Sequence, residues 1–244
     1  MKKYFGLALL MITLLTACTK ENELFKTPSP GDYFSLQTGK YITYNLDSTV
    51  FISFGTKDTV IKYQVKDSVE TKITDNQGRA AYRIFRYIRK DASQAWAANN
   101  TFMATPTATN IEFVENNLRF VKLISPIKED VTWNGNTYLT IDPYPSYTFS
   151  SDFMGDWTYT YKNVNAPLTV STFNLDSTLT VEEIDYTFAD PKTPGTQYAE
   201  RTYSIEKYAK RIGLVYKEFL HWEYQGNTKS YKGFGVKLTM IDHN

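Results

Sequence analysis

The stretch YKGFGVKLTMI, residues 231–241, decides the class of fold. Its apolar residues alternate with small or polar ones: Phe234, Val236, Leu238 and Met240 on one side, Gly235, Lys237 and Thr239 on the other. A period of two residues puts alternate side chains on opposite faces of an extended chain, as in a β-strand with one buried face. A helix would repeat its apolar residues every three or four positions instead. The stretch therefore predicts a half-buried strand.

The same alternation recurs upstream and predicts further strands. Ile61, Tyr63 and Val65 share one face, and the turn sequence DNQG at 75–78 leads into a partner strand at 81–90, which predicts a long hairpin. Further strands are expected at 41–54, 111–124, 157–162, 179–188, 200–208 and 213–224. Residues 92–98 have some helical character, but Asn99, Asn100 and the threonines after them favour a loop.

Long strands, several of them linked as hairpins, indicate an all-β protein. Aromatic residues make up 16% of the sequence, and aromatic residues favour strands over helices. The strand lengths favour one large, curved antiparallel sheet, either a half-barrel or an open barrel, and the alternative is a β-sandwich. We expect a single β domain over residues 33–244, long enough to bury one substantial core.

The N-terminal sequence predicts export and a lipid anchor. Lys2 and Lys3 precede an apolar run at 4–15, which is too short to cross a bilayer because a spanning helix needs roughly 20 residues. The run fits the apolar part of a signal peptide, here residues 1–17. The segment LTAC at 15–18 resembles the bacterial lipobox at all four positions. That resemblance implies cleavage between Ala17 and Cys18 and acylation of Cys18 with fatty acids such as palmitate, which would attach the protein to a membrane.

Residues 18–32 are expected to form a lipidated, flexible tether. The segment has no apolar period and contains Pro28, Pro30 and Gly31, so it buries too little surface to offset the entropy of ordering. The run TKENE at 19–23 resembles the lysine-plus-acid signal that sends Bacteroidota lipoproteins to the cell surface. The resemblance implies an outer-membrane protein exposed at the cell surface, and the alternative is an anchor that faces the periplasm.

Two further motifs resemble an uncharacterised family of Bacteroidota lipoproteins. YFSLQTGKYITY at 33–44 is similar to the opening Y-F-P-L-x-x-G-x-x-W-x-Y, with Ser35 and Ile42 in place of proline and tryptophan. YAKRIGLVYKE at 208–218 is similar to Y-A-x-G-V-G-L-V-x-x-E, with Arg211 in place of the first glycine. The resemblance implies a curved sheet like that of lipoprotein carriers, and no catalytic residues. Gly39 and Gly213 in these motifs indicate turns or bulges.

Charge and composition argue against several functions. Without the signal peptide the chain has 27 − 2 = 25 basic residues against 26 acidic ones, with no run of lysine or arginine, which argues against a nucleic-acid partner. Cys18 is the only cysteine, so no disulfide forms within the chain. His221 and His243 are the only histidines and lie outside any zinc-binding motif, so we expect neither a metal nor another cofactor.

No catalytic residue is predicted. His221 and Glu223 have the spacing of an acid–base or metal half-site on one strand face, and an acidic cluster occurs further upstream at Glu182, Glu183 and Asp185. We interpret both groups as solvated, because neither a nucleophile motif nor an aromatic-walled cleft is visible beside them. We therefore expect a non-catalytic protein.

Aromatic rings between residues 133 and 161 are the better candidates for binding. The candidate binding residues are Trp133, Tyr138, Tyr144, Tyr147, Trp157 and Tyr159. Such rings on turn-rich sequence can form a platform for a sugar or a protein, and equally they can fill a β core. Two functions stay open: an envelope lipoprotein that binds a glycan, peptide or hydrophobic ligand, and a structural component that docks another envelope protein. An enclosed apolar cavity favours the first, and a flat exposed aromatic patch the second.

Overall fold

The computed structural model describes residues 28–149 and 153–244, which fold into an all-β structure with three short 3₁₀ helices at Pro30–Tyr33, Ser53–Gly55 and Met154–Asp156. The strands are β1 Tyr41–Ile52, β2 Lys57–Thr74, β3 Ala80–Arg89, β4 Ala97–Pro106, β5 Asn110–Glu115, β6 Leu118–Ile124, β7 Thr132–Asn134, β8 Thr158–Val170, β9 Phe173–Phe188, β10 Tyr198–Ala209, β11 Gly213–Gln225 and β12 Ser230–His243. Within these described residues, no helix is both long and apolar enough to cross a membrane.

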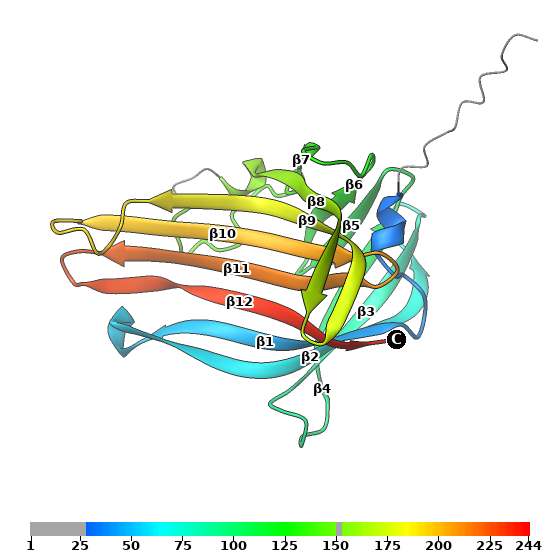
Figure 1. The fold of residues 1–244 in the computed structure, drawn as a ribbon, viewed down its shortest axis with the longest axis horizontal. Helices are drawn as coiled ribbons and strands as arrows, with labels where there is room; N and C mark the ends of the chain where they lie inside the picture. Colours follow the sequence, from blue (N-terminus) through cyan, green and yellow to red (C-terminus); the bar gives the residue numbers. More distant parts are fainter. Residues whose placement is uncertain (1–27, 150–152) are drawn as a thin grey trace, which may run out of the picture.

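The twelve described strands form one antiparallel sheet, so the prediction of a single sheet is confirmed and the β-sandwich alternative is wrong. The strand order is β6-β5-β4-β3-β2-β1-β12-β11-β10-β9-β8-β7. From the middle of the sheet, one arm runs outward from β1 to β6 and the other returns from β7 to β12 (Figure 1). The first and last strands therefore pair in the centre, for example at Thr43 with Asp242 and at Val50 with Phe234.

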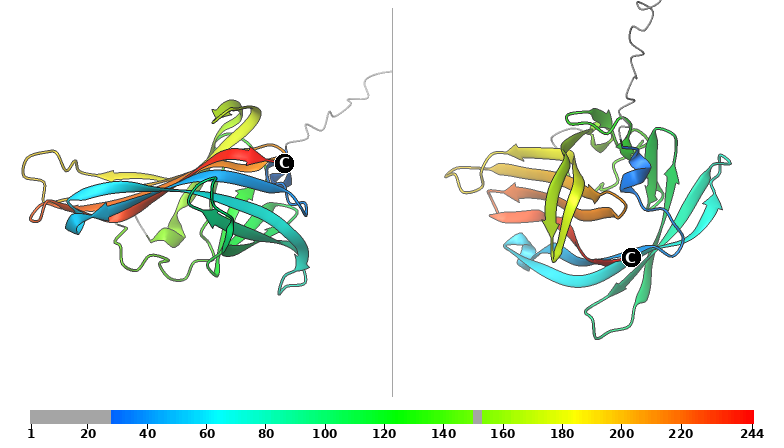
Figure 2. Two further views of the ribbon diagram at one scale, coloured as in Figure 1. Left: turned by 90° about the horizontal axis from the view of Figure 1, so that it is seen from below. Right: turned by 45° about the vertical axis from the view of Figure 1, so that its right-hand side comes forward.

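The two arms curve until the outer strands β6 and β7 come close together, which makes the sheet a nearly closed barrel (Figure 2). We call the gap between these strands the β6–β7 seam. The Val121 amide donates to the Gly135 carbonyl at 2.7 Å, and the Trp133 indole donates to the Val121 carbonyl at 2.8 Å. The Tyr161 hydroxyl accepts from the amide of Ile124 at 2.7 Å and donates to its carbonyl at 2.8 Å. These contacts bridge the seam without a regular ladder.

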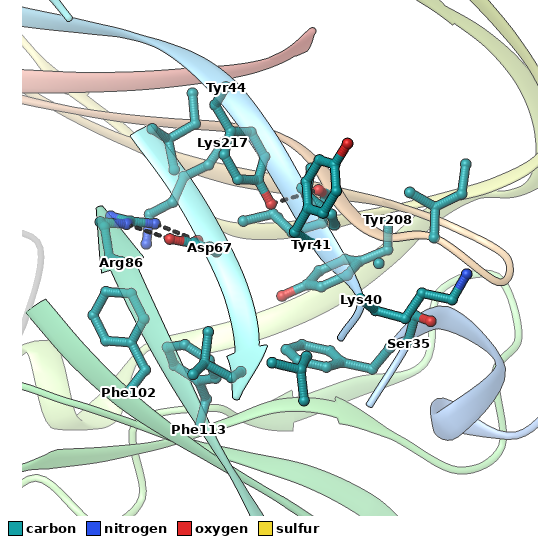
Figure 3. A pocket seen from close by; sticks show the side chains of 18 of the residues that line it. Ser35, Lys40, Tyr41, Tyr44, Asp67, Arg86, Phe102, Phe113, Tyr208 and Lys217 are labelled. Carbon is teal, nitrogen blue, oxygen red and sulfur yellow. Dashed lines mark hydrogen bonds and ion pairs between the residues drawn. The ribbon is translucent and has the colours of Figure 1, made fainter. Parts of the chain in front are cut away.

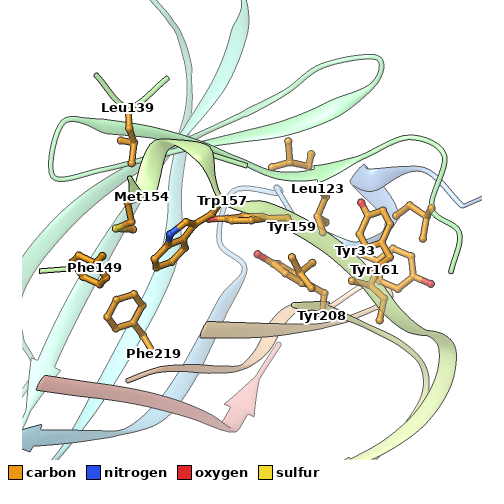
Figure 4. Packing of buried hydrophobic residues seen from close by; sticks show 14 residues of the cluster. Tyr33, Leu123, Leu139, Phe149, Met154, Trp157, Tyr159, Tyr161, Tyr208 and Phe219 are labelled. Carbon is orange, nitrogen blue, oxygen red and sulfur yellow. The ribbon is translucent and has the colours of Figure 1, made fainter. Parts of the chain in front are cut away.

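The largest hydrophobic cluster lies beside the seam, and half of its buried residues are aromatic (Figure 4). Trp157, Tyr159 and Tyr161 of the β8 region pack in it with Tyr33 from the first 3₁₀ helix and Phe219 from β11. A second cluster packs the tip of the β8–β9 hairpin against β11 and β12, and Ser171 donates to the Met240 carbonyl there at 2.7 Å. Burial of these rings replaces the disulfides that the sequence lacks.

Left-handed backbone conformations mark where strands end. Asn116 and Asn117, with φ of 51° and 63°, divide the predicted strand 111–124 into β5 and β6, because a tight hairpin turn requires two positive φ angles. Gly39 and Gly213 have φ of 89° and 121°, so both need the backbone freedom of glycine; Gly39 lies in a turn, and Gly213 begins β11 just after a turn. Arg211 has φ of 68°, so the position where the resembling family has glycine keeps the conformation that glycine favours.

Several boundaries differ from the sequence-based expectation. The strand predicted at 157–162 continues to Val170 in β8, and the one predicted at 179–188 begins at Phe173 in β9. The loop favoured over residues 92–98 is confirmed at 92–96, but the strand that follows it was not predicted: β4 occupies Ala97–Pro106 and pairs with β3 and β5. Its first half is largely exposed and therefore shows no apolar face in the sequence.

The described chain starts inside the predicted tether 18–32, whose flexibility stays a prediction. Ser29 caps the first 3₁₀ helix, and the Arg211 amide donates to the Asp32 carbonyl at 2.6 Å. The signal segment 1–17, Cys18 and the chain up to residue 27 lie outside the described residues.

Candidate functional site inside the barrel

A cavity of about 130 Å³ lies between the first arm of the sheet and strands β10–β12 (Figure 3). Most of its wall is apolar, formed by residues that include Phe34, Leu36, Ile84, Phe102, Phe113 and Leu238. An apolar cavity of about 150 Å³ accommodates a molecule the size of benzene. The cavity is partly open, so it can hold an apolar group of about this size while the rest of a small ligand extends beyond it, and it cannot enclose a whole phospholipid.

Buried charges adjoin this apolar wall. The Lys122 ammonium on β6 donates to Glu183 on β9 at 3.0 Å and to Glu206 on β10 at 2.8 Å. Lys217 on β11 contacts the same oxygen of Glu206 at 3.1 Å. The second oxygen of Glu206 accepts from the Tyr208 hydroxyl at 2.5 Å. Strands β9, β10 and β11 of the second arm and β6 of the first arm therefore contribute side chains to one ionic network.

The side chains of this network are exposed to different degrees. Those of Lys122, Glu183 and Glu206 are 7%, 5% and 2% exposed, whereas that of Lys217 is 20% exposed. Lys122, Glu206 and Lys217 line the cavity. Lys217 is therefore the member of the network that is most accessible from the cavity.

The pKa values follow from the pairing. Burial alone would raise the pKa of Glu206, but the charges of Lys122 and Lys217 outweigh it and lower this pKa from 4.5 to about 2. Burial would lower the pKa of Lys122, yet Glu183 and Glu206 hold it well above its ordinary value. The pKa of Lys217 is raised against the same burial penalty, chiefly by Glu206. All three groups are charged at neutral pH.

The alternation of β10 explains how carboxylates reach the interior. Glu200, Thr202, Ser204 and Glu206 occupy alternate positions and are all buried, so this strand turns a polar face inward. Ser204 donates to Glu183 at 2.6 Å, which ties β10 to β9. Buried carboxylates require such partners, because leaving one without a partner costs several kcal/mol.

A second ion pair lines the cavity from the first arm. Arg86 on β3 donates through Nε and Nη2 to the two oxygens of Asp67 on β2, at 2.6 and 2.7 Å. Burial would lower the pKa of Arg86, but Asp67 holds it above its ordinary value. In the described part of the chain, Arg86 makes no hydrogen bond through Nη1. The Arg86 guanidinium also lies 4.7 Å from the Phe102 ring centre, which fixes its orientation.

His221 and Glu223 lie further along β11, and the structure corrects their interpretation as solvated residues. His221 is fully buried and Glu223 is 6% exposed. The Nδ1 atom of His221 lies 3.0 Å from the Thr202 hydroxyl, and its Nε2 atom lies 3.5 Å from a Glu223 oxygen. Burial lowers the pKa of His221 below its ordinary value although Glu223 opposes the shift.

Glu183 was likewise interpreted as solvated, and it is buried in the ionic network instead. Glu182 and Asp185 lie near it on β9 and are more exposed. Within residues 28–149 and 153–244, His, Asp, Glu and Cys side chains form no cluster that could hold a metal ion.

The six predicted binding aromatics do not form one exposed platform. Trp157 and Tyr159 are core residues, 3% and 1% exposed, and Trp133 packs against Tyr159 and Tyr161. Tyr144 and Tyr147 are half-buried against Phe234, whereas Tyr138 is 51% exposed. A role in binding remains a prediction for these residues, and the geometry gives Trp157 and Tyr159 a packing role.

Sequence reasoning did not single out the residues that line the cavity. The one available signal was Lys122, which lies between the apolar residues Val121 and Leu123, whereas Glu206 and Lys217 have the charged neighbours Lys207 and Glu218. Lysine and glutamate at such positions usually face water. Their inward direction becomes visible only when the sheet closes.

No protein-family profile matches the sequence, and no curated protein matches it at a significant level. Among solved structures, the chain is similar to a protein from Bacteroides fragilis described as exported and having a YmcC-like fold, with 11% identity and a TM-score of 0.36, over 86% of this chain and 99% of that one. It is also similar to a protein from Parabacteroides distasonis described as a lipoprotein, with 11% identity and a TM-score of 0.31, over 87% of this chain and 98% of that one. Neither likeness assigns a ligand, a location or an activity to this chain.

Proposed function

We propose that this protein is a non-catalytic lipoprotein of the bacterial envelope, anchored through acylated Cys18, whose barrel binds a small hydrophobic molecule. The observation that carries the binding proposal is the cavity, because an apolar concavity with a few fixed polar groups is the usual form of a small-molecule site. The LTAC segment at 15–18 supports the anchor. We place the protein at the outer membrane, exposed at the cell surface, from the TKENE run that follows Cys18.

A cavity-filling variant tests the binding proposal. Leu36 lines the cavity and is only half-buried, so Leu36→Trp places an indole in the site at modest cost to folding. Val60 is 45% exposed and lies outside the cavity, so Val60→Trp is the matched control. The neutral fluorescent probe N-phenyl-1-naphthylamine should bind the unmodified protein and the control, and bind Leu36→Trp at least about tenfold more weakly. No binding to the unmodified protein, or equal binding to all three, would overturn the proposal.

The anchor and the location have separate tests. Cys18→Ser should abolish labelling by a palmitate analogue and release the protein from membranes. Persistent membrane association of that variant would contradict the anchor. Protease added to intact cells should remove the domain if it faces outward, and protection from the protease would favour the periplasmic alternative.

The second candidate function is docking of another envelope protein. One observation favours it: Phe54, at the tip between β1 and β2, is completely exposed and has a left-handed φ of 57°. Backbone strain of this kind persists where the surrounding structure or a function requires it. A cross-linked partner that is lost in Phe54→Ser and kept in Leu36→Trp would support docking in place of ligand binding.

A further inference from the structure

The charged side chains that line the cavity bear on the class of its ligand, and this step rests on the binding function proposed above. Four cationic side chains line it, Lys40, Arg86, Lys122 and Lys217, against three carboxylates, Asp67, Glu115 and Glu206. Glu183 pairs with Lys122 at 3.0 Å beside the lining, so the cationic and anionic side chains balance. The charge of the ligand therefore depends on which cations keep free donors, and a cation attracts an anion more strongly beside an apolar wall than in water.

The donors that remain for a ligand belong to two of these cations. Lys217 has three N–H groups, and within the described residues its ammonium contacts one carboxylate oxygen, on Glu206. Arg86 uses Nε and Nη2 for Asp67, which leaves Nη1. Lys122, by contrast, is held between two carboxylates and is nearly inaccessible. Lys217 and Arg86 can therefore each donate to an acceptor in the cavity without giving up their present partners.

Glu115 lines the same cavity as these two cations. Its charge raises the pKa of Lys217 and also that of Arg86, although in each case another carboxylate contributes more. The ligand headgroup must therefore be compact enough to contact the two cations and to avoid this carboxylate.

We propose that the cavity binds an amphipathic anion, a short apolar chain that carries one negatively charged headgroup, with the headgroup held by Lys217 and Arg86. The apolar chain lies along Phe34, Phe102 and Phe113 (Figure 3). The headgroup is a carboxylate or a phosphate monoester, since both accept hydrogen bonds from ammonium and guanidinium groups. Lys40 lines the same cavity and adds to the positive potential that an entering anion meets.

Four probes with the same ten-carbon chain test the inference on the full-length protein: decanoate, decyl phosphate, decanol and decylamine. Each competes with N-phenyl-1-naphthylamine at pH 7.5, where the first two are anionic. We expect at least one anion to bind about tenfold or more tightly than decanol, because charge-assisted hydrogen bonds are stronger than neutral ones. Decylamine should bind more weakly than decanol. The ranking of decanoate against decyl phosphate identifies the headgroup.

Lys217→Met tests the residue assignment. It removes the ammonium and keeps much of the side-chain volume, while Lys122 still pairs Glu206. The preference for the anion over decanol should fall to less than about threefold, with the affinity for decanol unchanged. Lys207→Met is the matched control, because Lys207 lies over the Tyr216 ring and does not line the cavity.

The outcomes separate the two proposals. Binding of all four probes with equal affinity, or tighter binding of decylamine, overturns the anionic ligand and leaves the binding function standing. Displacement of the reporter by none of them, together with no binding of the reporter itself, overturns the binding function and the inference with it. Should Lys217→Met fail to fold, the ranking of the four probes on the unmodified protein still decides the charge of the ligand.

Discussion

Val121 and Gly135 join the two edges of the barrel: the amide of Val121 on β6 donates to the carbonyl of Gly135, just after β7, at 2.7 Å. Gly135 fits there because its missing side chain leaves room for the Tyr159 ring, whose nearest atom would lie 2.2 Å from an added Cβ. Tyr159 is itself buried and holds Asn136 through a hydrogen bond of 2.7 Å. The hydrogen bond between Val121 and Gly135 therefore depends on glycine at position 135, because a side chain there would meet the Tyr159 ring.

Gly135→Ala is therefore expected to destabilise the protein. The added methyl group cannot be accommodated without displacing a buried ring, which costs about 1–3 kcal/mol in the free energy of unfolding. Urea denaturation followed by tryptophan fluorescence measures the change. Gly31→Ala is the control, because the nearest atom to its added Cβ is 3.7 Å away. Equal stability of the two variants would contradict the assigned role of Gly135.

Lys122→Met should destabilise the protein more strongly. The change leaves Glu183 without its cation and leaves Glu206 with Lys217 alone, both in a buried setting. Removing one partner of a buried ionic group typically costs about 3–5 kcal/mol. Lys162→Met breaks the exposed pair with Asp130 and should change the unfolding midpoint little. Similar midpoints for the two variants would show that the buried network adds no stability.

The network also predicts a pH dependence. The pKa of Glu206 is lowered from 4.5 to about 2 in the folded protein, so the unfolded chain binds the proton first as pH falls. The stabilisation from this group is complete above about pH 4.5 and is lost as pH falls toward about 2. Thermal unfolding between these values should show a falling midpoint. Glu206→Gln should have a shallower slope over that range, and an unchanged slope would refute the assignment.

Trp157→Ala separates packing from binding among the predicted aromatics. Trp157 packs against Phe149 and stacks on Phe219 in the core, so its truncation should cost about 3–5 kcal/mol. Tyr138→Ala removes an exposed ring and should leave the unfolding curve unchanged. Recovery of partners from an envelope extract should be compared for these two variants. If the Tyr138→Ala variant remains folded and loses a partner, the result supports a binding role for the Tyr138 ring.

The sequence predicted the strands best where one face of the strand is apolar and the other is exposed to solvent. The hairpin expected over 61–90 is formed by β2 and β3, and the alternation at 231–241 belongs to β12. Strand β4 was missed because its exposed half carries alanines, asparagines and threonines with no apolar face to detect. The Asn116–Asn117 turn had a signal in its residue types, since asparagine tolerates a positive φ.

The site was less predictable, for a physical reason. A polar residue in a strand is normally assigned to the solvent face, but a nearly closed sheet has an interior that can be polar. Lys122, Glu183 and Glu206 are far apart in sequence and satisfy one another only after closure. His221 was misassigned for the same reason. The period of two residues shows which residues share a face of a strand. Which of the two faces points into the barrel follows only from the curvature of the sheet.

The pairing of β1 with β12 also constrains when folding can finish. Ile42 pairs with His243 and Val50 with Phe234, so the central contact joins residues 234 − 50 = 184 to 243 − 42 = 201 positions apart. Loop closure over such a distance is slow, and here it cannot occur until the last strand has left the ribosome. Until then both β1 and β11 are open edges. That delay is compatible with the export that the N-terminal sequence predicts, because a chain that is still unfolded can be threaded through a narrow channel.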